Sequence, residues 1–187
     1  EGRAAGEKEG IEVVAGVEIG IAHDPDRNLI ETDILGYLVD PDDEPLNTAL
    51  DRLQDAKNNK LYKQIAVLAR NGLEIDADEV LSQAGGDTLR RPHIWKVLRA
   101  HYPDLRPEEF FDRTSFGGEW HVSKDFSLTL EETVKLVEGA GGVPVLAHPG
   151  AYNETFADGG PLIDPGVDYT IEVCAGAGVK GLEVLYS

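Results

Sequence analysis

The sequence predicts an α/β protein, in which segments of strand character alternate with segments of helical periodicity. Val- and Ile-rich stretches at 11–21 and 29–39 are typical of strands. Residues 46–72 carry Leu and Ile at helical spacing. A third stretch combines both patterns, because a helix expected over 129–141 precedes a short apolar strand at 143–147. This order of elements indicates part of a barrel built from strands and helices.

The first 45 residues are expected to form one segment of that barrel. Residues 1–9 have the composition of a polar helix end, and the strand at 11–21 carries Glu18 in an otherwise apolar run. A carboxylate buried in such a run needs a partner or a metal ion. The alternative is a glutamate that points to solvent from an alternating strand.

The strand expected at 29–39 carries a second acidic residue, Asp33. Carboxylate oxygens are suitable ligands for Mn²⁺ and Mg²⁺. The strand position by itself is that of an exposed residue, and Asp33 becomes a candidate metal ligand only through a resemblance to a known family.

Residues 46–114 are predicted to form an inserted helical lobe. The acidic residues and proline at 42–45 favour a helix start. Residues 57–60 are polar, so they are either an exposed turn of that helix or a break in it. Further helices are expected from Asp76 onward, at 92–101 and at 107–113.

A basic motif in the lobe, Arg90-Arg91-Pro92-His93, lies at a predicted helix start. Backbone amides, a guanidinium group and an imidazole that converge at a helix N-terminus form a suitable phosphate site. The guanidinium group of Arg91 and the imidazole of His93 are therefore candidates for such a phosphate site. The alternative is a pair of solvated arginines.

Residues 115–187 are expected to return to the barrel. A short strand is predicted at 119–122, and the strand at 143–147 stops at His148. Pro149 favours an extended backbone at His148, which places the imidazole at the strand end. A helix at 169–177 and a strand at 182–186 follow, and Glu183 in that strand is expected to be structural.

Several stretches together resemble the PHP (polymerase and histidinol phosphatase) superfamily. They are "AGGVPVLAHPG" at 140–150, "GIEVVAGVEIG" at 10–20, "ILGYLVDPDD" at 34–43, "RRPHIWKVL" at 90–98 and the closing "GVKGLEVLYS". The branch that they resemble contains nucleoside-phosphate phosphatases and an RNA exonuclease that trims 5′ ends. The resemblance covers nearly the whole chain and implies a partial irregular (β/α) barrel, with barrel segments at 1–45 and 115–187 around the inserted lobe.

The resemblance implies a metal-dependent phosphoesterase. Glu18, His148 and Asp33 would hold divalent ions, Mn²⁺ foremost, with Mg²⁺, Zn²⁺ or Fe²⁺ as alternatives, and Arg91 and His93 would contact the substrate. Such ions activate a water molecule and stabilise charge on the phosphate. Glu18 and His148 should then lie within roughly 3–7 Å of each other, because clustered ions sit that close.

One residue departs from the family pattern, which usually has a histidine where this chain has Asp33. The expected substrate is a nucleotide or the end of a short oligonucleotide. The departure at Asp33 keeps a second hypothesis open: a catalytically inactive PHP-like module with a structural or protein-interaction role.

The composition limits the classes of partner. The 187 residues include 35 acidic and 17 basic side chains, a net charge of −18, which disfavours extended nucleic-acid binding. Either an adaptation to high salt or an ordinary acidic cytosolic protein explains this charge. The single cysteine and the lack of an apolar run of about 20 residues favour a cytoplasmic protein without membrane spans.

The family pattern also includes a strand with paired histidines before this stretch and an Asp-x-His strand after it. The chain carries neither motif. We therefore expect a central portion of a longer protein that has little hydrolase activity by itself.

Overall fold

The computed structural model describes residues 2–84, 90–149 and 166–184 of the chain, which divides into two compact units. The first unit comprises residues 1–49 and 127–187, and the second comprises residues 50–126. The helix α2 (Glu44–Arg70) begins in the first unit and continues into the second. The candidate metal ligands belong to the first unit and the candidate phosphate-binding residues to the second.

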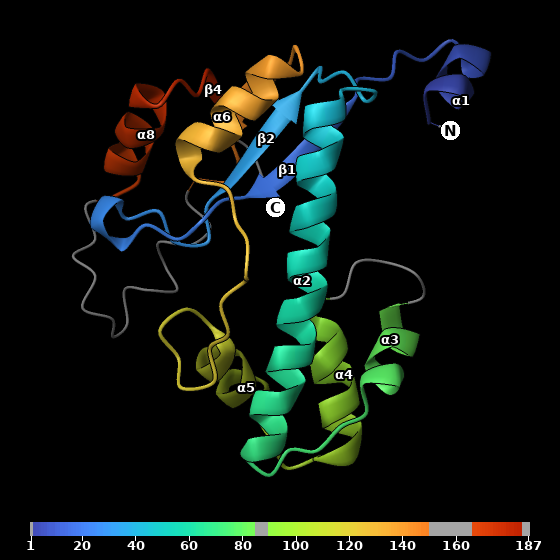
Figure 1. Cartoon of the computed structure of the whole chain (residues 1–187), viewed down its shortest axis with the longest axis vertical. Helices are drawn as coiled ribbons and strands as arrows, with labels where there is room; N and C mark the ends of the chain where they lie inside the picture. The colour runs from blue at the N-terminus through green and yellow to red at the C-terminus, as the bar shows by residue number, and fades with distance from the viewer. Residues whose placement is uncertain (1, 85–89, 150–165, 185–187) are drawn as a thin grey trace. The chain divides into compact units, whose positions relative to one another are not determined.

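The first unit contains a four-stranded sheet (Figure 1). Its strands are β1 (Gly16–Gly20), β2 (Asp33–Tyr37), β3 (Val143–Leu146) and β4 (Gly181–Leu182), in that spatial order. The pairings β1–β2 and β2–β3 are antiparallel, and β3–β4 is parallel. The predicted α/β class is confirmed. A barrel segment is not, because a (β/α) barrel has parallel strands throughout.

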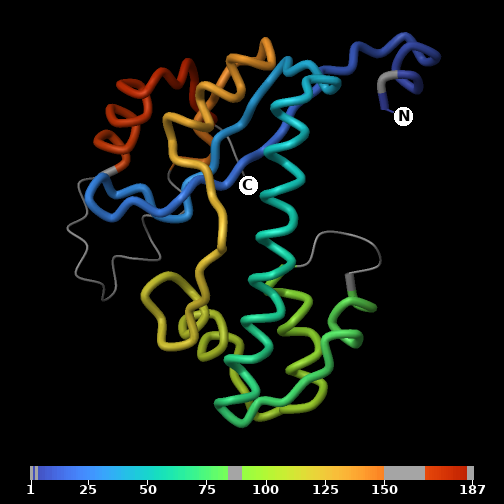
Figure 2. Tube along the Cα trace, in the orientation of Figure 1, coloured from blue at the N-terminus to red at the C-terminus, as the bar shows by residue number. Residues whose placement is uncertain are grey.

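Helices cover one face of this sheet. The helices α6 (Leu130–Gly139) and α8 (Gly166–Gly176) contribute to a buried cluster with residues of the sheet and of the segment between β1 and β2. The cluster consists of Ile21, Leu29, Ile34, Leu130, Val134, Leu146 and Cys174. Figure 2 shows the early strands and the segment after α6 side by side, although more than 100 residues separate β2 from β3. A further helix, α1 (Gly2–Glu9), precedes the sheet.

The start of α6 is fixed by its own sequence, as predicted. The Thr129 hydroxyl accepts a hydrogen bond from the Glu132 amide, and the Glu132 carboxylate accepts one from the Thr129 amide. This reciprocal capping satisfies two amides that a helix N-terminus otherwise leaves without partners. After the helix, Gly142 packs closely against Val39, because a Cβ at residue 142 would lie 2.5 Å from Val39 Cγ1 and would displace that side chain. The chain can therefore pass from α6 directly into β3.

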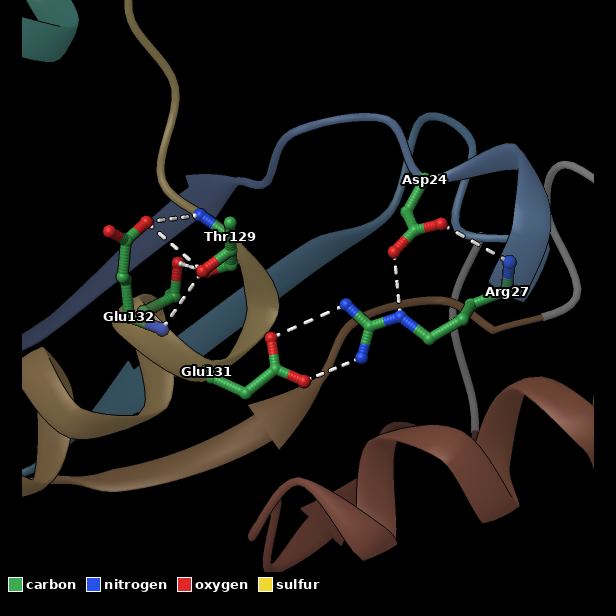
Figure 3. A network of polar contacts seen from close by, with 6 residues as sticks. Asp24, Arg27, Thr129, Glu131 and Glu132 are labelled. Atoms are coloured by element: carbon green, nitrogen blue, oxygen red, sulfur yellow. Dashed lines mark hydrogen bonds and ion pairs between the residues drawn. The ribbon is translucent and has the colours of Figure 1, made fainter.

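An ion-pair network ties the short 3₁₀ helix η1 (Pro25–Arg27) to the first turn of α6 (Figure 3). The Arg27 guanidinium donates from Nε to Asp24 at 2.6 Å and from Nη2 to Glu131 at 3.3 Å. The hydrogen bond from Arg27 holds the pKa of Glu131 below its ordinary value. The segment between β1 and β2 is thereby attached to the helix layer.

Because of this network, we expect part of the free energy of unfolding to be lost at acidic pH. A carboxyl group with a lowered folded-state pKa stabilises the fold above its unfolded pKa of 4.5, and this stabilisation is lost as the pH falls through the folded pKa. Glu131→Gln should reduce the pH dependence of the unfolding free energy below about pH 4.5, by less than ~1 kcal/mol because the pair is partly exposed. Urea titrations from pH 3 to pH 6 measure it. An exposed control, Glu172→Gln, should leave the curve unchanged.

The second unit is helical. It contains most of α2, with α3 (Ala77–Ala84), α4 (Arg91–His101) and α5 (Pro107–Thr114). Its core includes the fully buried Leu98 and Phe110, and the Trp95 ring stacks on Phe110 with 5.6 Å between ring centroids. The helix α2 runs through 57–60 without a break, so the exposed-turn interpretation is correct. Within the described residues, no helix is both long enough and apolar enough to cross a membrane.

Four strand predictions need correction. The strand expected at 29–39 forms only at Asp33–Tyr37, and the strand expected at 182–186 forms, within the described residues, only at Gly181–Leu182. Residues 119–122 are not a strand, because Trp120 donates its amide to the Arg113 carbonyl and His121 donates to Gly118, which makes a turn after α5. The strand expected at 11–21 forms only at Gly16–Gly20. Residues 11–14 are exposed and lack a neighbouring strand in the described sheet, so their β-favouring side chains do not suffice.

Candidate metal centre

The ends of three neighbouring strands lie side by side in the sheet of the first unit. Gly20 at the end of β1 pairs with Asp33 at the start of β2, and Ile34 pairs with Leu146 at the end of β3. Beyond β3, the Ala147 amide donates to the Asp33 carbonyl at 3.1 Å. This bond brings His148, the next residue, beside Asp33.

The register also decides which side chains share a face. Cross-strand partners project from the same face of a sheet, as do residues two apart in one strand. Asp33 is the partner of Gly20, which lies two residues after Glu18, so Glu18 and Asp33 share a face. Ile19 and Ile34 project from the opposite face and are buried.

Glu18, Asp33 and His148 form a compact group. His148 Nε2 lies 3.3 Å from Glu18 Oε1 and 3.4 Å from Asp33 Oδ2. One possible ligand atom from each of the three lies within 4.8 Å of the others. The predicted proximity of Glu18 and His148 is confirmed, whereas the role of the group as metal ligands stays a prediction.

The Glu18 side chain is more exposed than expected. It is 54% exposed, against 21% for His148 and 25% for Asp33. The interpretation of Glu18 as a buried carboxylate is therefore wrong, because its apolar neighbours Val17 and Ile19 project from the other face of the strand. Its exposure leaves the carboxylate accessible to an ion from solution.

The chemistry and spacing of this group fit a divalent cation. Two carboxylates and one imidazole provide the mixed oxygen and nitrogen donors that suit Mn²⁺, Fe²⁺ and Zn²⁺. At metal–ligand distances of about 2.0–2.2 Å, neighbouring ligand atoms lie roughly 2.8–3.6 Å apart. The separations of 3.3 and 3.4 Å fall within that range. One ion could therefore contact all three side chains with small adjustments.

The backbone at His148 differs from the prediction. Its φ is 27°, in the left-handed region, although the following Pro149 favours an extended conformation. A residue with a side chain pays on the order of 1–2 kcal/mol for this conformation. The His148 amide donates to Glu183 Oε2 at 2.9 Å. A tertiary contact therefore accompanies a conformation that the local sequence disfavours.

From the sequence, Glu183 was expected to be structural. The contact between the Glu183 carboxylate and the His148 amide was not predicted. Glu183 follows β4, and its amide donates to the Leu146 carbonyl at 2.9 Å. Its position in a predicted strand gave no signal for the contact, because the pairing of β3 with β4 is not visible in the sequence.

Arg91 and His93 lie in the second unit, in the first turn of α4. Arg91 Nη1 donates to Ser115 Oγ at 3.0 Å, and His93 Nδ1 accepts from the Arg90 amide at 3.2 Å. When His93 is neutral, this bond leaves the ring proton on Nε2, which is then a donor. Ser115 thus holds the Arg91 side chain. The side chains of Arg91 and His93 both retain donor groups that suit an anion.

Comparison with known proteins identifies similar folds. No protein-family model matches the sequence, and no curated protein matches it either. A solved structure from Bifidobacterium adolescentis, of a protein assigned to the metal-dependent phosphoesterases, is 26% identical with a TM-score of 0.72. An amidohydrolase from Chromobacterium violaceum, solved with sulfate and without metal, is 23% identical with the same TM-score.

Both comparisons cover 96% of this chain, but the chain spans only about 60% of the length of either structure. The first likeness supports a fold of the metal-dependent hydrolase kind. The second, at 23% identity, concerns the fold alone.

Proposed function

We propose that this chain provides metal ligands for hydrolysis of phosphoesters in the manner of the PHP superfamily. The observation that carries the proposal is the group formed by Glu18, Asp33 and His148, whose ligand atoms lie within 4.8 Å of one another. The likeness to a structure assigned to the metal-dependent phosphoesterases supports the same reaction class.

Each of the three residues has a role in this proposal. Glu18 and Asp33 supply negatively charged oxygen donors, and His148 supplies Nε2. A divalent ion, Mn²⁺ foremost, would lower the pKa of a water molecule and stabilise the charge that develops on the phosphate oxygens. The ion would also remove the repulsion between the two carboxylates, which favours binding to this group.

The substrate in this proposal is a nucleotide or a short oligonucleotide end. The net charge of −18 opposes binding of a long phosphate backbone, whereas a local cation can bind one phosphate group. Arg91 and His93 are proposed to bind the substrate. Their place in the first turn of α4, where backbone amides also face an anion, supports this role.

The competing hypothesis of an inactive module depended on aspartate at position 33, where the family usually has histidine. In the structure, Asp33 Oδ2 lies 3.4 Å from His148 Nε2, a separation compatible with two ligands of one ion. The geometry therefore favours Asp33 as a functional replacement over a lost ligand.

The proposal is tested by titrating the chain with Mn²⁺, followed by electron paramagnetic resonance, and then with a nucleoside 5′-monophosphate by calorimetry. We expect saturable Mn²⁺ binding, and nucleotide binding that requires Mn²⁺ and is abolished by EDTA. Adenosine without phosphate is the control and should not bind. Nucleotide binding of equal strength with and without the metal would contradict the proposed function, as would failure to bind Mn²⁺.

A further inference from the structure

Glu183 replaces a main-chain hydrogen bond at the point where β3 leaves the sheet. The Leu146 carbonyl accepts from the Glu183 amide at 2.9 Å. In a regular parallel ladder, the carbonyl of residue 183 would next accept from the amide of residue 148. Instead, the His148 amide donates to the Glu183 carboxylate, Oε2, at 2.9 Å. The ladder therefore ends with a side-chain acceptor.

The replacement coincides with the change in backbone direction at His148. Its φ of 27° takes this residue out of the extended conformation that a continuing strand requires. The conformation is unusual for a residue with a side chain, and persists only where surrounding contacts determine it. A side-chain acceptor can adjust its position to reach the displaced His148 amide. A main-chain carbonyl of the neighbouring strand is fixed in the sheet and cannot.

We infer that Glu183 is a positioning residue that fixes the backbone of His148 and thereby directs its imidazole toward Glu18 and Asp33. The use of this geometry for metal binding rests on the proposed function. Glu183 does not belong to the group of ligand atoms around His148 Nε2. Its carboxylate binds the main-chain amide of a proposed ligand, a position outside the donor atoms that is comparable to that of the outer-shell partners which orient ligand side chains.

A carboxylate is suited to this position because a charged acceptor makes a shorter and stronger hydrogen bond to an amide than a neutral one. The contact between the Glu183 carboxylate and the His148 amide leaves the sheet pairing intact, since the Glu183 amide still donates to the Leu146 carbonyl. Removal of the side chain should thus leave β4 paired and release only the amide of His148.

The first measurement needs no metal ion. In Glu183→Ala, hydrogen exchange at the His148 amide, followed by NMR, should become about 10-fold faster or more, because a charge-assisted hydrogen bond is lost. Glu183→Gln retains an acceptor oxygen and should restore most of the protection. Glu172→Ala, which removes the same charge from an exposed position on α8, should have no effect.

The second measurement is the Mn²⁺ affinity of the same variants. Glu183→Ala should bind Mn²⁺ about 10- to 100-fold more weakly than the unaltered chain, the usual effect of losing an outer-shell partner. Glu183→Gln should recover most of the affinity, and Glu172→Ala should match the unaltered chain. If Glu183→Ala does not fold, Glu183→Asp, which withdraws the carboxylate by one methylene, should show both losses.

The outcomes separate this inference from the proposed function. Unchanged exchange at the His148 amide in Glu183→Ala, or in Glu183→Asp if that variant is used, would overturn the inference. Faster exchange with unchanged Mn²⁺ affinity would also overturn it, since the imidazole would not depend on the contact. If the unaltered chain binds no Mn²⁺, the proposed function fails, and the exchange measurement alone decides the role of Glu183.

Discussion

Replacement of His148 by alanine is expected to abolish saturable Mn²⁺ binding by the chain, a loss of at least about 100-fold. Loss of an outer-shell partner alone typically costs about 10- to 100-fold in metal affinity, and loss of a direct ligand costs more. His148 Nε2 lies between Glu18 Oε1 and Asp33 Oδ2, at 3.3 and 3.4 Å. Without the imidazole, the two carboxylates would lack their only nitrogen donor in this group.

The measurement is electron paramagnetic resonance of free Mn²⁺ during a titration, repeated with His101→Ala as a matched control. His101 belongs to α4 in the second unit, where its Nε2 lies 2.8 Å from Glu79 Oε2. That variant loses an imidazole beside a carboxylate, but not at the candidate centre, and should bind Mn²⁺ normally. Equal binding by His148→Ala and the unaltered chain would exclude His148 as a ligand.

The three residues of the candidate centre could be selected from the sequence because each lies near a strand end or in a stretch that resembles a family motif. Glu18 interrupts an apolar strand, Asp33 directly precedes "ILGY", and His148 ends the run before Pro149. Short apolar strands position their terminal residues predictably once the strands pair. The structure places these three side chains together although Asp33 and His148 are 115 positions apart in the sequence.

The detailed geometry was not accessible because it depends on tertiary contacts. The exposure of Glu18 depends on which face of the sheet the helices cover. The left-handed backbone of His148 overrides the preference imposed by Pro149, and its amide is bound by Glu183, 35 residues further along the chain. Local propensity describes the residue alone, whereas this conformation is accompanied by a contact with Glu183, the residue that follows β4.

The helices were predicted more accurately than the strands, for a related reason. A helix carries its signals within its own sequence, as the reciprocal capping of Thr129 and Glu132 shows. A strand requires a neighbour. The β-rich residues 11–14 do not extend β1, and the predicted strand at 119–122 is a turn held by the end of α5.

Replacement of Arg91 by alanine is expected to weaken nucleotide binding in the presence of Mn²⁺ by about 10- to 100-fold. This range corresponds to the proposed charge-assisted contact with phosphate, which would be worth ~1.5–3 kcal/mol. Arg91 is partly buried and donates from Nη1 to Ser115 Oγ at 3.0 Å. An anchored guanidinium loses less side-chain freedom on binding a phosphate than a fully mobile one, which favours a contact at the stronger end of that range.

The matched control is Arg99→Ala, which removes the same charge from an exposed position on α4. A general electrostatic effect on an acidic protein would weaken nucleotide binding similarly in both variants, and increasingly so at low salt. A direct contact predicts a large loss for Arg91→Ala alone, measured by calorimetry with the nucleotide, together with unchanged Mn²⁺ affinity. Equal nucleotide affinities for Arg91→Ala and the unaltered chain would identify Arg91 as a surface charge anchored to Ser115.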